Sequence, residues 1–305
     1  MDAANTSFTQ STDRGPSPGL WEANGAHTRS KLDDNPSLGW YEWDDFIGVP
    51  TNLFTNPTLT TQVAFGRYKA FAENSGSIQP TSGGTAGTVG IANSSGTVTT
   101  VPEIGGILKF VTGTGDNDSI SLQSWPSNFQ IYNGSGKVFF EARVKLVTGV
   151  TNGGMFLGLM EQQTLADVVP LIDALSALST GVDAVGFMKQ ETIAGYTDTV
   201  YALAGTTTVI QTGISTATGP SATPMVTDTY VKLGFYYDPI TALVTFYRNG
   251  LPLSTTKAVS ATAGSAFPNN VLLAPTFAYK NSTGAAVTSC LDWWYCQQQP
   301  QTRIT

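Results

Sequence analysis

Lys137-Val-Phe-Phe-Glu-Ala-Arg-Val-Lys-Leu146 is the most regular stretch of this 305-residue sequence. Alternate positions are apolar: Val138, Phe140, Ala142, Val144 and Leu146. The positions between them hold Phe139, Glu141, Arg143 and Lys145. Because successive side chains of a β-strand point to opposite faces of the sheet, this period of two predicts a strand with one apolar and one polar face. Such strands are typical of antiparallel sheets that cover a core on one side.

Short strands separated by turn residues are predicted on both sides of this stretch. They cover residues 40–46, 66–71, 107–111, 119–123, 155–160, 184–188, 199–203, 230–237, 242–248, 271–273, 276–279 and 291–295. Asn249-Gly250 directly follows one of them, and this dipeptide is the strongest short hairpin signal. Residues 165–178 form one predicted helix, which Pro170 keeps short. Many short strands with one short helix predict an all-β sandwich.

The first 38 residues differ from the rest, because they are rich in Asn, Ser, Asp, Pro and Gly with few apolar side chains. Alone, such a segment cannot bury enough apolar surface to offset the entropy lost on ordering. We predict an extended N-terminal arm over residues 1–38, held by its own domain or, preferably, by a neighbouring subunit. The sandwich then covers residues 39–305, and its uncharged, Gly/Ser/Thr-rich part at 75–101 predicts a hairpin or a surface excursion.

The charge balance excludes several classes of function. Only 12% of residues are charged, against about 25% in a typical domain. A net charge of −7 and a pI near 4.6 argue against a nucleic-acid-binding protein, which needs a basic surface. No run of about 18 apolar residues would span a membrane, and the first residues lack the pattern of a secretory signal. Cys290 and Cys296 are about 20 Å apart along one predicted strand, too far for a disulfide, and are predicted to be buried thiols.

Several of these strands, in this order, resemble the concanavalin A-like lectin/glucanase superfamily, a jelly-roll sandwich of two large sheets. The matching pieces are residues 136–146, 156–159, 237–250 and 291–295. The opening Trp40-Tyr-Glu-Trp-Asp-Asp-Phe46 is similar to the start of the variant found in virion structural proteins of tailed bacteriophages. The resemblance implies a concanavalin A-like jelly roll and, for the phage variant, a capsid decoration or cement protein located in the virion.

Fold does not decide function, so the residues have to be tested for chemistry. Retaining glucanases of this superfamily carry Glu-x-Asp-x-x-Glu or a near variant on one strand, with catalytic carboxylates about 5 Å apart. The sequence holds no such run. The resemblance places Glu141 on an edge-forming strand where the matching residue is not catalytic, and Asp44 and Asp45 would face opposite sides of a strand. We therefore predict no catalytic residue and no enzyme activity.

Cofactor and metal sites are not predicted either. The single histidine, His27, lies in the arm, and one histidine with two distant cysteines cannot build a tetrahedral zinc site. No phosphate-binding glycine loop is present. Asp116 and Asp118 offer oxygen ligands for Ca²⁺, but their surroundings equally suit a tight turn. We therefore predict no bound metal. Asp116 and Asp118 are the two residues to examine if a metal is found.

Five tryptophans are candidates for an interface or for stacking on a sugar ring: Trp21, Trp40, Trp43, Trp293 and Trp294. The last two are neighbours in a strand, so at most one of them faces any given groove. Tryptophan is enriched at protein interfaces. Residues 199–227 carry no charge, which suits a surface covered by a neighbouring subunit or by the domain itself.

Two hypotheses of function follow. The first is a non-enzymatic structural protein of a bacteriophage virion that decorates or cements the capsid, with the major capsid protein and neighbouring copies of itself as partners. The alternative is a carbohydrate-binding fibre or tail module that recognises host surface glycans. A glucanase-like depolymerase is a third possibility, but it needs paired carboxylates in a cleft, which the sequence does not show.

Overall fold

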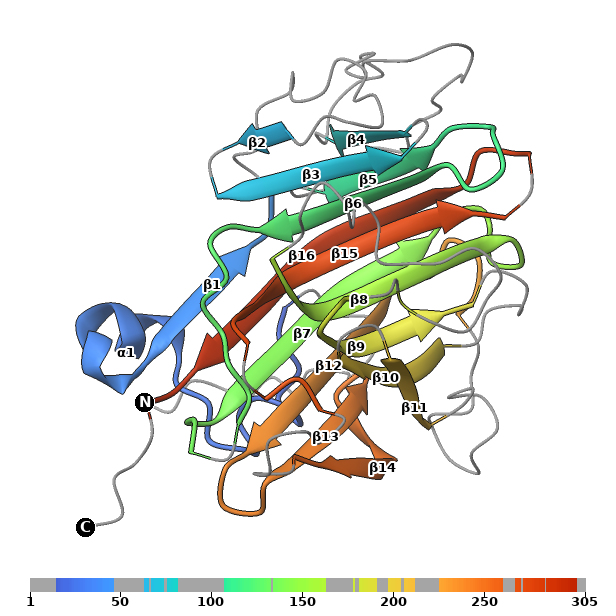
Figure 1. Cartoon of the computed structure of the whole chain (residues 1–305). Helices are drawn as coiled ribbons and strands as arrows, with labels where there is room; N and C mark the ends of the chain where they lie inside the picture. The colour runs from blue at the N-terminus through green and yellow to red at the C-terminus, as the bar shows by residue number, and fades with distance from the viewer. Residues whose placement is uncertain are drawn as a thin grey trace.

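The computed structural model describes residues 15–46, 63–65, 67–73, 76–81, 107–132, 134–162, 178, 181–190, 197–203, 206–211, 225–259, 267–269, 271–282 and 284–300. Regular structure in these residues is almost all strand, and the strands form two antiparallel sheets packed face to face (Figure 1). This is a jelly-roll β-sandwich, so the predicted fold class is confirmed.

The two sheets have eight strands each. Across sheet A the order is β14 (Leu251–Ala258), β13 (Leu243–Arg248), β12 (Val231–Asp238), β7 (Val138–Leu146), β16 (Thr288–Gln298), β5 (Ile107–Thr112) and β4 (Gly76–Thr81), and β1 (Trp40–Asp44) pairs with the second half of β16. Across sheet B it is β11 (Thr206–Gln211), β10 (Thr197–Leu203), β9 (Ala184–Lys189), β8 (Gly153–Glu161), β15 (Leu273–Asn281), β6 (Ser119–Ser124), β3 (Tyr68–Glu73) and β2 (Val63–Phe65). The helices α1 (Arg29–Asp34) and η1 (Pro36–Leu38) precede β1.

Strand β7 lies in the middle of sheet A. Glu141 pairs with Gly234 of β12 on one side and with Tyr295 of β16 on the other. The expectation that this strand forms an edge was therefore wrong. Its neighbour β16 is the last strand in the described part of the chain, and local sequence carries no sign of such a distant pairing.

The Asn249-Gly250 turn joins β13 to β14, as its sequence predicts. Both residues have positive φ angles, 50° and 76°. A two-residue turn with positive φ at both positions matches the right-handed twist of the flanking strands. Glycine adopts this conformation at little steric cost.

The main core lies between the two sheets. The apolar set predicted for β7 is fully buried there, together with large side chains from the inner faces of both sheets: Phe110, Phe187, Phe235, Phe246, Phe277 and Trp294. The apolar half of the alternation was thus read correctly.

The other face of β7 is also buried, which corrects the prediction of a polar face turned to solvent. Phe139 and Glu141 have no exposed surface, and Lys145 keeps only 6%. Part of the cover comes from the arm, because Leu20 and Trp21 pack against this outer face of sheet A. In this structure of one chain, the described part of the arm packs on its own sandwich, and its docking on a neighbouring subunit stays a prediction.

Some predicted elements fall wholly or partly outside the described residues. The segment at 75–101 begins with β4, which pairs with β5 in sheet A, and its part from residue 82 onward lies outside. The predicted helix at 165–178 also lies outside, apart from Leu178. No helix in the described part of the chain is long and apolar enough to cross a membrane.

Candidate functional site

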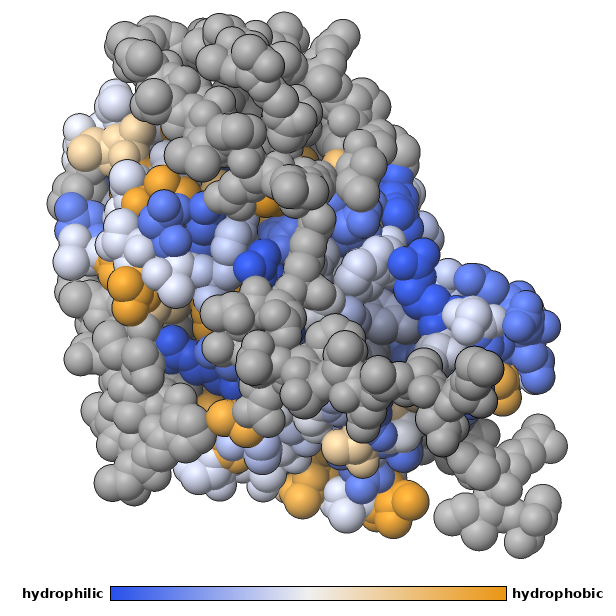
Figure 2. Space-filling view, turned by 180° about the vertical axis from the view of Figure 1, so that it is seen from behind, coloured by the Kyte–Doolittle hydropathy of each residue, from blue (hydrophilic) through white to orange (hydrophobic). Residues whose placement is uncertain are grey.

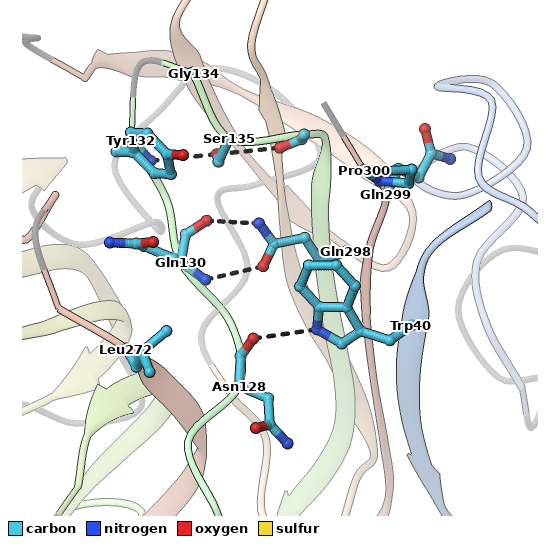
Figure 3. A pocket seen from close by; sticks show the side chains of 11 residues that line it. Trp40, Asn128, Gln130, Tyr132, Gly134, Ser135, Leu272, Gln298, Gln299 and Pro300 are labelled. Carbon is cyan, nitrogen blue, oxygen red and sulfur yellow. Dashed lines mark hydrogen bonds between the residues drawn. The ribbon is translucent and has the colours of Figure 1, made fainter. Parts of the chain in front are cut away.

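A pocket of about 240 Å³ opens at the end of the sandwich where β1 begins and β16 ends (Figure 3). One wall comes from residues 128–132 and 134–136, between β6 and β7, here called the loop 128–136. The opposite wall holds Trp40 of β1 with Gln298 and Gln299 at the end of β16. Leu272 and Pro300 complete the lining. The fold thus brings together segments from the start, the middle and the end of the chain.

Trp40 is the aromatic wall of this pocket. It lies beside Gln298 in the register of β1 and β16. Its indole Nε1 donates a hydrogen bond of 3.1 Å to the backbone oxygen of Asn128, which fixes the ring across from the loop. The residue nevertheless keeps 43% of its surface exposed. The ring is therefore held in place with surface left open to a ligand.

The loop opposite is fixed by its backbone. The side-chain amide of Gln298 accepts from the backbone nitrogen of Gln130 at 2.9 Å and donates to its oxygen at 3.0 Å, as a neighbouring strand would. The hydroxyl of Tyr237 donates to the backbone oxygen of Tyr132 at 2.8 Å. Because these bonds use backbone atoms, they hold the loop without occupying its side chains.

The side-chain amides of Asn128 and Gln130 make no hydrogen bond within the described part of the chain. In Figure 3 the Asn128 amide lies on the same side of the loop as Trp40, whereas the Gln130 amide points to the other side, away from the ring. Each amide offers two donors and one acceptor group. The pocket therefore presents the unused hydrogen-bonding groups of Asn128 on the side of a fixed aromatic ring.

Every residue that lines the pocket is uncharged. The volume is below the roughly 300 Å³ at which pockets for drug-sized ligands begin. A small neutral ligand with polar groups on its edge and an apolar face matches this lining, since amides can bind the edge and Trp40 can cover the face.

Two carboxyl groups lie farther along β1, on the same face as Trp40. The carboxylate of Glu42 accepts from the hydroxyl of Ser124, across the space between the sheets. Burial raises the pKa of the Glu42 carboxyl to about 7. The pKa of Asp44 is also raised, again chiefly by burial.

These two groups are engaged inside the protein and do not line the pocket. Asp44 accepts hydrogen bonds from Tyr68 and, at 2.9 Å, from Arg67. The sequence did contain a sign of the pair, because Trp40, Glu42 and Asp44 alternate along one strand. Comparing Asp44 with Asp45 alone does not reveal this spacing.

The tryptophans singled out from the sequence lie in three different surroundings. Trp293 and Trp294 point to opposite faces of sheet A, and both are fully buried. Trp293 stacks on the partly buried Trp43, with ring centroids 5.4 Å apart. Trp21 is buried against Tyr295, and among the five only Trp40 reaches the pocket.

The candidate metal ligands form a turn. Oδ2 of Asp118 accepts from the backbone nitrogen of Gly115 at 2.8 Å, and Asp118 is 3% exposed, whereas Asp116 faces solvent. Within the described ranges, no group of three or more His, Cys, Asp or Glu side chains is placed to hold a metal. Cys290 and Cys296 are free and buried, as predicted.

The amides that make up the pocket were not recognised in the sequence. Asn128, Gln130, Gln298 and Gln299 are single polar residues in two distant segments. Only the pairing of β1 with β16 and the position of the loop bring them together, and neither is visible in local sequence.

A solved structure shares this fold. The structure is similar to that of a protein of unknown function from Shewanella oneidensis MR-1, with a TM-score of 0.51 and 15% sequence identity over 92% of this chain and 98% of that chain. This likeness shows a shared fold. No protein-family model matches the sequence, and neither does any curated protein.

Other similar structures include a glucanase and a lectin. They are an endo-1,3-β-glucanase from Streptomyces sioyaensis (TM-score 0.45, 10% identity, 85% of this chain and 97% of that chain) and peanut lectin (TM-score 0.42, 10% identity, 78% and 100%). The capsid-decoration form of the fold stays a prediction.

Proposed function

We propose that the protein is a non-catalytic carbohydrate-binding module whose ligand site is the pocket between Trp40 and the loop 128–136. The observation that carries this proposal is the fixed, exposed ring of Trp40 with the unused amide of Asn128 on the same side of the loop. A sugar ring has hydroxyl groups around its edge and C–H groups on its faces. Amides suit the first and an indole face suits the second.

The uncharged lining also indicates which kind of sugar the pocket would bind. Uronic acids, sialic acid and phosphorylated sugars carry a negative charge, and the lining offers no cation to pair with it. The expected ligand is therefore a neutral sugar unit at the end or on the side of a host glycan. Catalysis is not part of the proposal, because Glu42 and Asp44 are engaged between the sheets and outside the pocket.

A glycan array of bacterial surface polysaccharides, followed by calorimetric titration of the best ligand, tests the proposal. Trp40→Ala should abolish binding, and Asn128→Ala should weaken it at least tenfold. Trp125→Ala is the matched control, because Trp125 is also 43% exposed but lies outside the pocket. An array without any hit, or binding unaffected by Trp40→Ala, would contradict the assignment.

Capsid decoration, the first hypothesis drawn from the sequence, stays a prediction beside this proposal. The copy number of the protein in purified virus particles tests it. A number close to that of the major capsid protein would favour a decoration subunit, and a few copies would favour a fibre or tail module. Its absence from particles would remove a virion role altogether.

A further inference from the structure

Residues 15–25, here called the strap, fill an aromatic recess on the outer face of sheet A. The recess is lined by aromatic side chains from four strands: Phe139, Tyr236, Tyr247, Trp293 and Tyr295. Leu20 and Trp21 of the strap enter it and retain 0% and 5% exposed surface. The recess is thus a preformed surface of one sheet that a separate segment completes.

Trp21 anchors the strap by stacking and by hydrogen bonding. Its ring lies parallel to that of Tyr295, with centroids 4.1 Å apart and an angle of 10° between the planes. Its indole Nε1 and the backbone nitrogen of Ser17 both donate to Oε2 of Glu141, each at 2.8 Å. A buried carboxylate bound in this way selects an N–H group at one fixed position.

The strap docks as a self-contained unit. Its turns are closed by its own backbone, for example from Leu20 N to Ser17 O at 3.0 Å and from Ala26 N to Trp21 O at 2.9 Å. It pairs with neither sheet as a strand, and the printed register of β7 and its neighbours does not include it. The strap can therefore leave the recess without breaking a sheet ladder.

A tether of residues 26–39 joins the strap to β1. It contains α1 and η1, and Gly25 and Gly39 at its two ends have positive φ angles of 74° and 134°. Helix α1 stands away from the two sheets in Figure 1, and in Figure 2 it forms a hydrophilic projection on the right. Fully extended, fourteen residues span about 45 Å, so the compact tether holds unused length.

We propose that the strap is exchanged between copies of this chain, so that Trp21 of one copy binds Glu141 and Tyr295 of a second copy. The same contacts form in either arrangement, because the recess and the strap are identical in all copies. In dilute solution, docking within one chain is favoured, because the tether keeps the strap at a high effective concentration near its own recess. Exchange is favoured where copies are crowded. The partner surface is thus the recess of another copy, and the proposal does not depend on carbohydrate binding.

Site-specific cross-linking in the full-length protein tests the exchange. Two copies with different affinity tags are co-expressed, and one carries a photoreactive amino acid at the exposed position of Glu22, next to Trp21. We expect cross-links from this position to β12 or β13 of the other tagged copy, together with dimers or larger species by native mass spectrometry at high concentration.

Variants distinguish strap exchange from other association. Trp21→Ala should remove both the cross-links between copies and the larger species, and Trp125→Ala should retain both. Cross-links confined to the same copy at every concentration would overturn the proposal. So would association that persists unchanged in the Trp21→Ala variant. Hydrogen exchange of sheet A checks that each variant is folded.

Discussion

Glu42 of β1 lies directly beside Cys296 of β16, so that a carboxyl group and a thiol share the buried space between the two sheets. Burial raises the pKa of the Glu42 carboxyl to about 7. Burial, together with the nearby Glu42, raises the pKa of the Cys296 thiol well above its usual value. Burial therefore favours the neutral form of both groups, and this has consequences for stability and for reactivity.

The first prediction concerns stability against pH. The folded protein holds a proton on Glu42 up to about pH 7, whereas the unfolded chain loses it near 4.5, so folding binds a proton between these values. Stability should fall as the pH rises from about 4.5 to about 7 and then level off. Glu42→Gln should stabilise the protein by up to about 3 kcal/mol at pH 8 and change little at pH 4.

Urea unfolding followed by tryptophan fluorescence at several pH values measures this difference. Glu22→Gln is the control, because Glu22 is exposed and should leave the pH profile unchanged. If Glu42→Gln and the unmodified protein lose stability in parallel between pH 4.5 and 7, the carboxyl of Glu42 is not responsible.

The second prediction concerns the thiols. Cys290 and Cys296 are buried, and the thiolate is the reactive form of cysteine. Neither should react with Ellman's reagent in the folded protein at pH 8, and both should react in 6 M guanidinium chloride, a standard unfolding concentration. Rapid reaction of one thiol per chain under native conditions would show that the space between the sheets opens near β16.

The third prediction separates strap contact from backbone strain. Gly250 and Gly181 both have positive φ angles, 76° and 90°. An added β-carbon at Gly250 would lie 2.8 Å from Cβ of Ser17 in the strap, whereas at Gly181 it would meet nothing within 4 Å. Gly181→Ala should cost about 1 kcal/mol from strain alone. Gly250→Ala should cost more and should loosen the strap.

Thermal unfolding compares the two variants, and hydrogen exchange of residues 17–21 reports on the strap. Equal losses in melting temperature with an unchanged strap would mean that Ser17 does not rest against the turn.

The fourth prediction concerns the wall of the pocket. Gln298→Ala removes the two hydrogen bonds that hold the backbone of Gln130 and should cost about 1–2 kcal/mol of stability. It should also weaken sugar binding with Trp40 intact, because the loop loses its fixed position. Hydrogen exchange of residues 128–132 should become faster. Gln299→Ala is the control for stability and for hydrogen exchange of the loop, since its amide donates to Gly25 and not to Gln130.

The sequence predicted those features that depend on local pattern. The alternation over 137–146 placed Phe140 and Val144 in the core, and Asn249-Gly250 placed a turn. Prediction from the sequence failed where contacts join residues far apart in the chain. Glu141 looked like a solvent-facing residue because its partner Trp21 is 120 residues away. The pocket could not be predicted for the same reason, since Trp40 and Asn128 are 88 residues apart in the sequence.

Strand β16 also sets the order in which the chain can fold during synthesis. It is made after β1, β5 and β7, yet it pairs with all three and so completes the middle of sheet A. Until then these three strands present unpaired edges, which invite association with other nascent chains. Folding of sheet A must therefore wait until residues 288–298 have been made. A ribosome stalled before residue 288 would hold a chain whose N-terminal strand has no partner in this sheet.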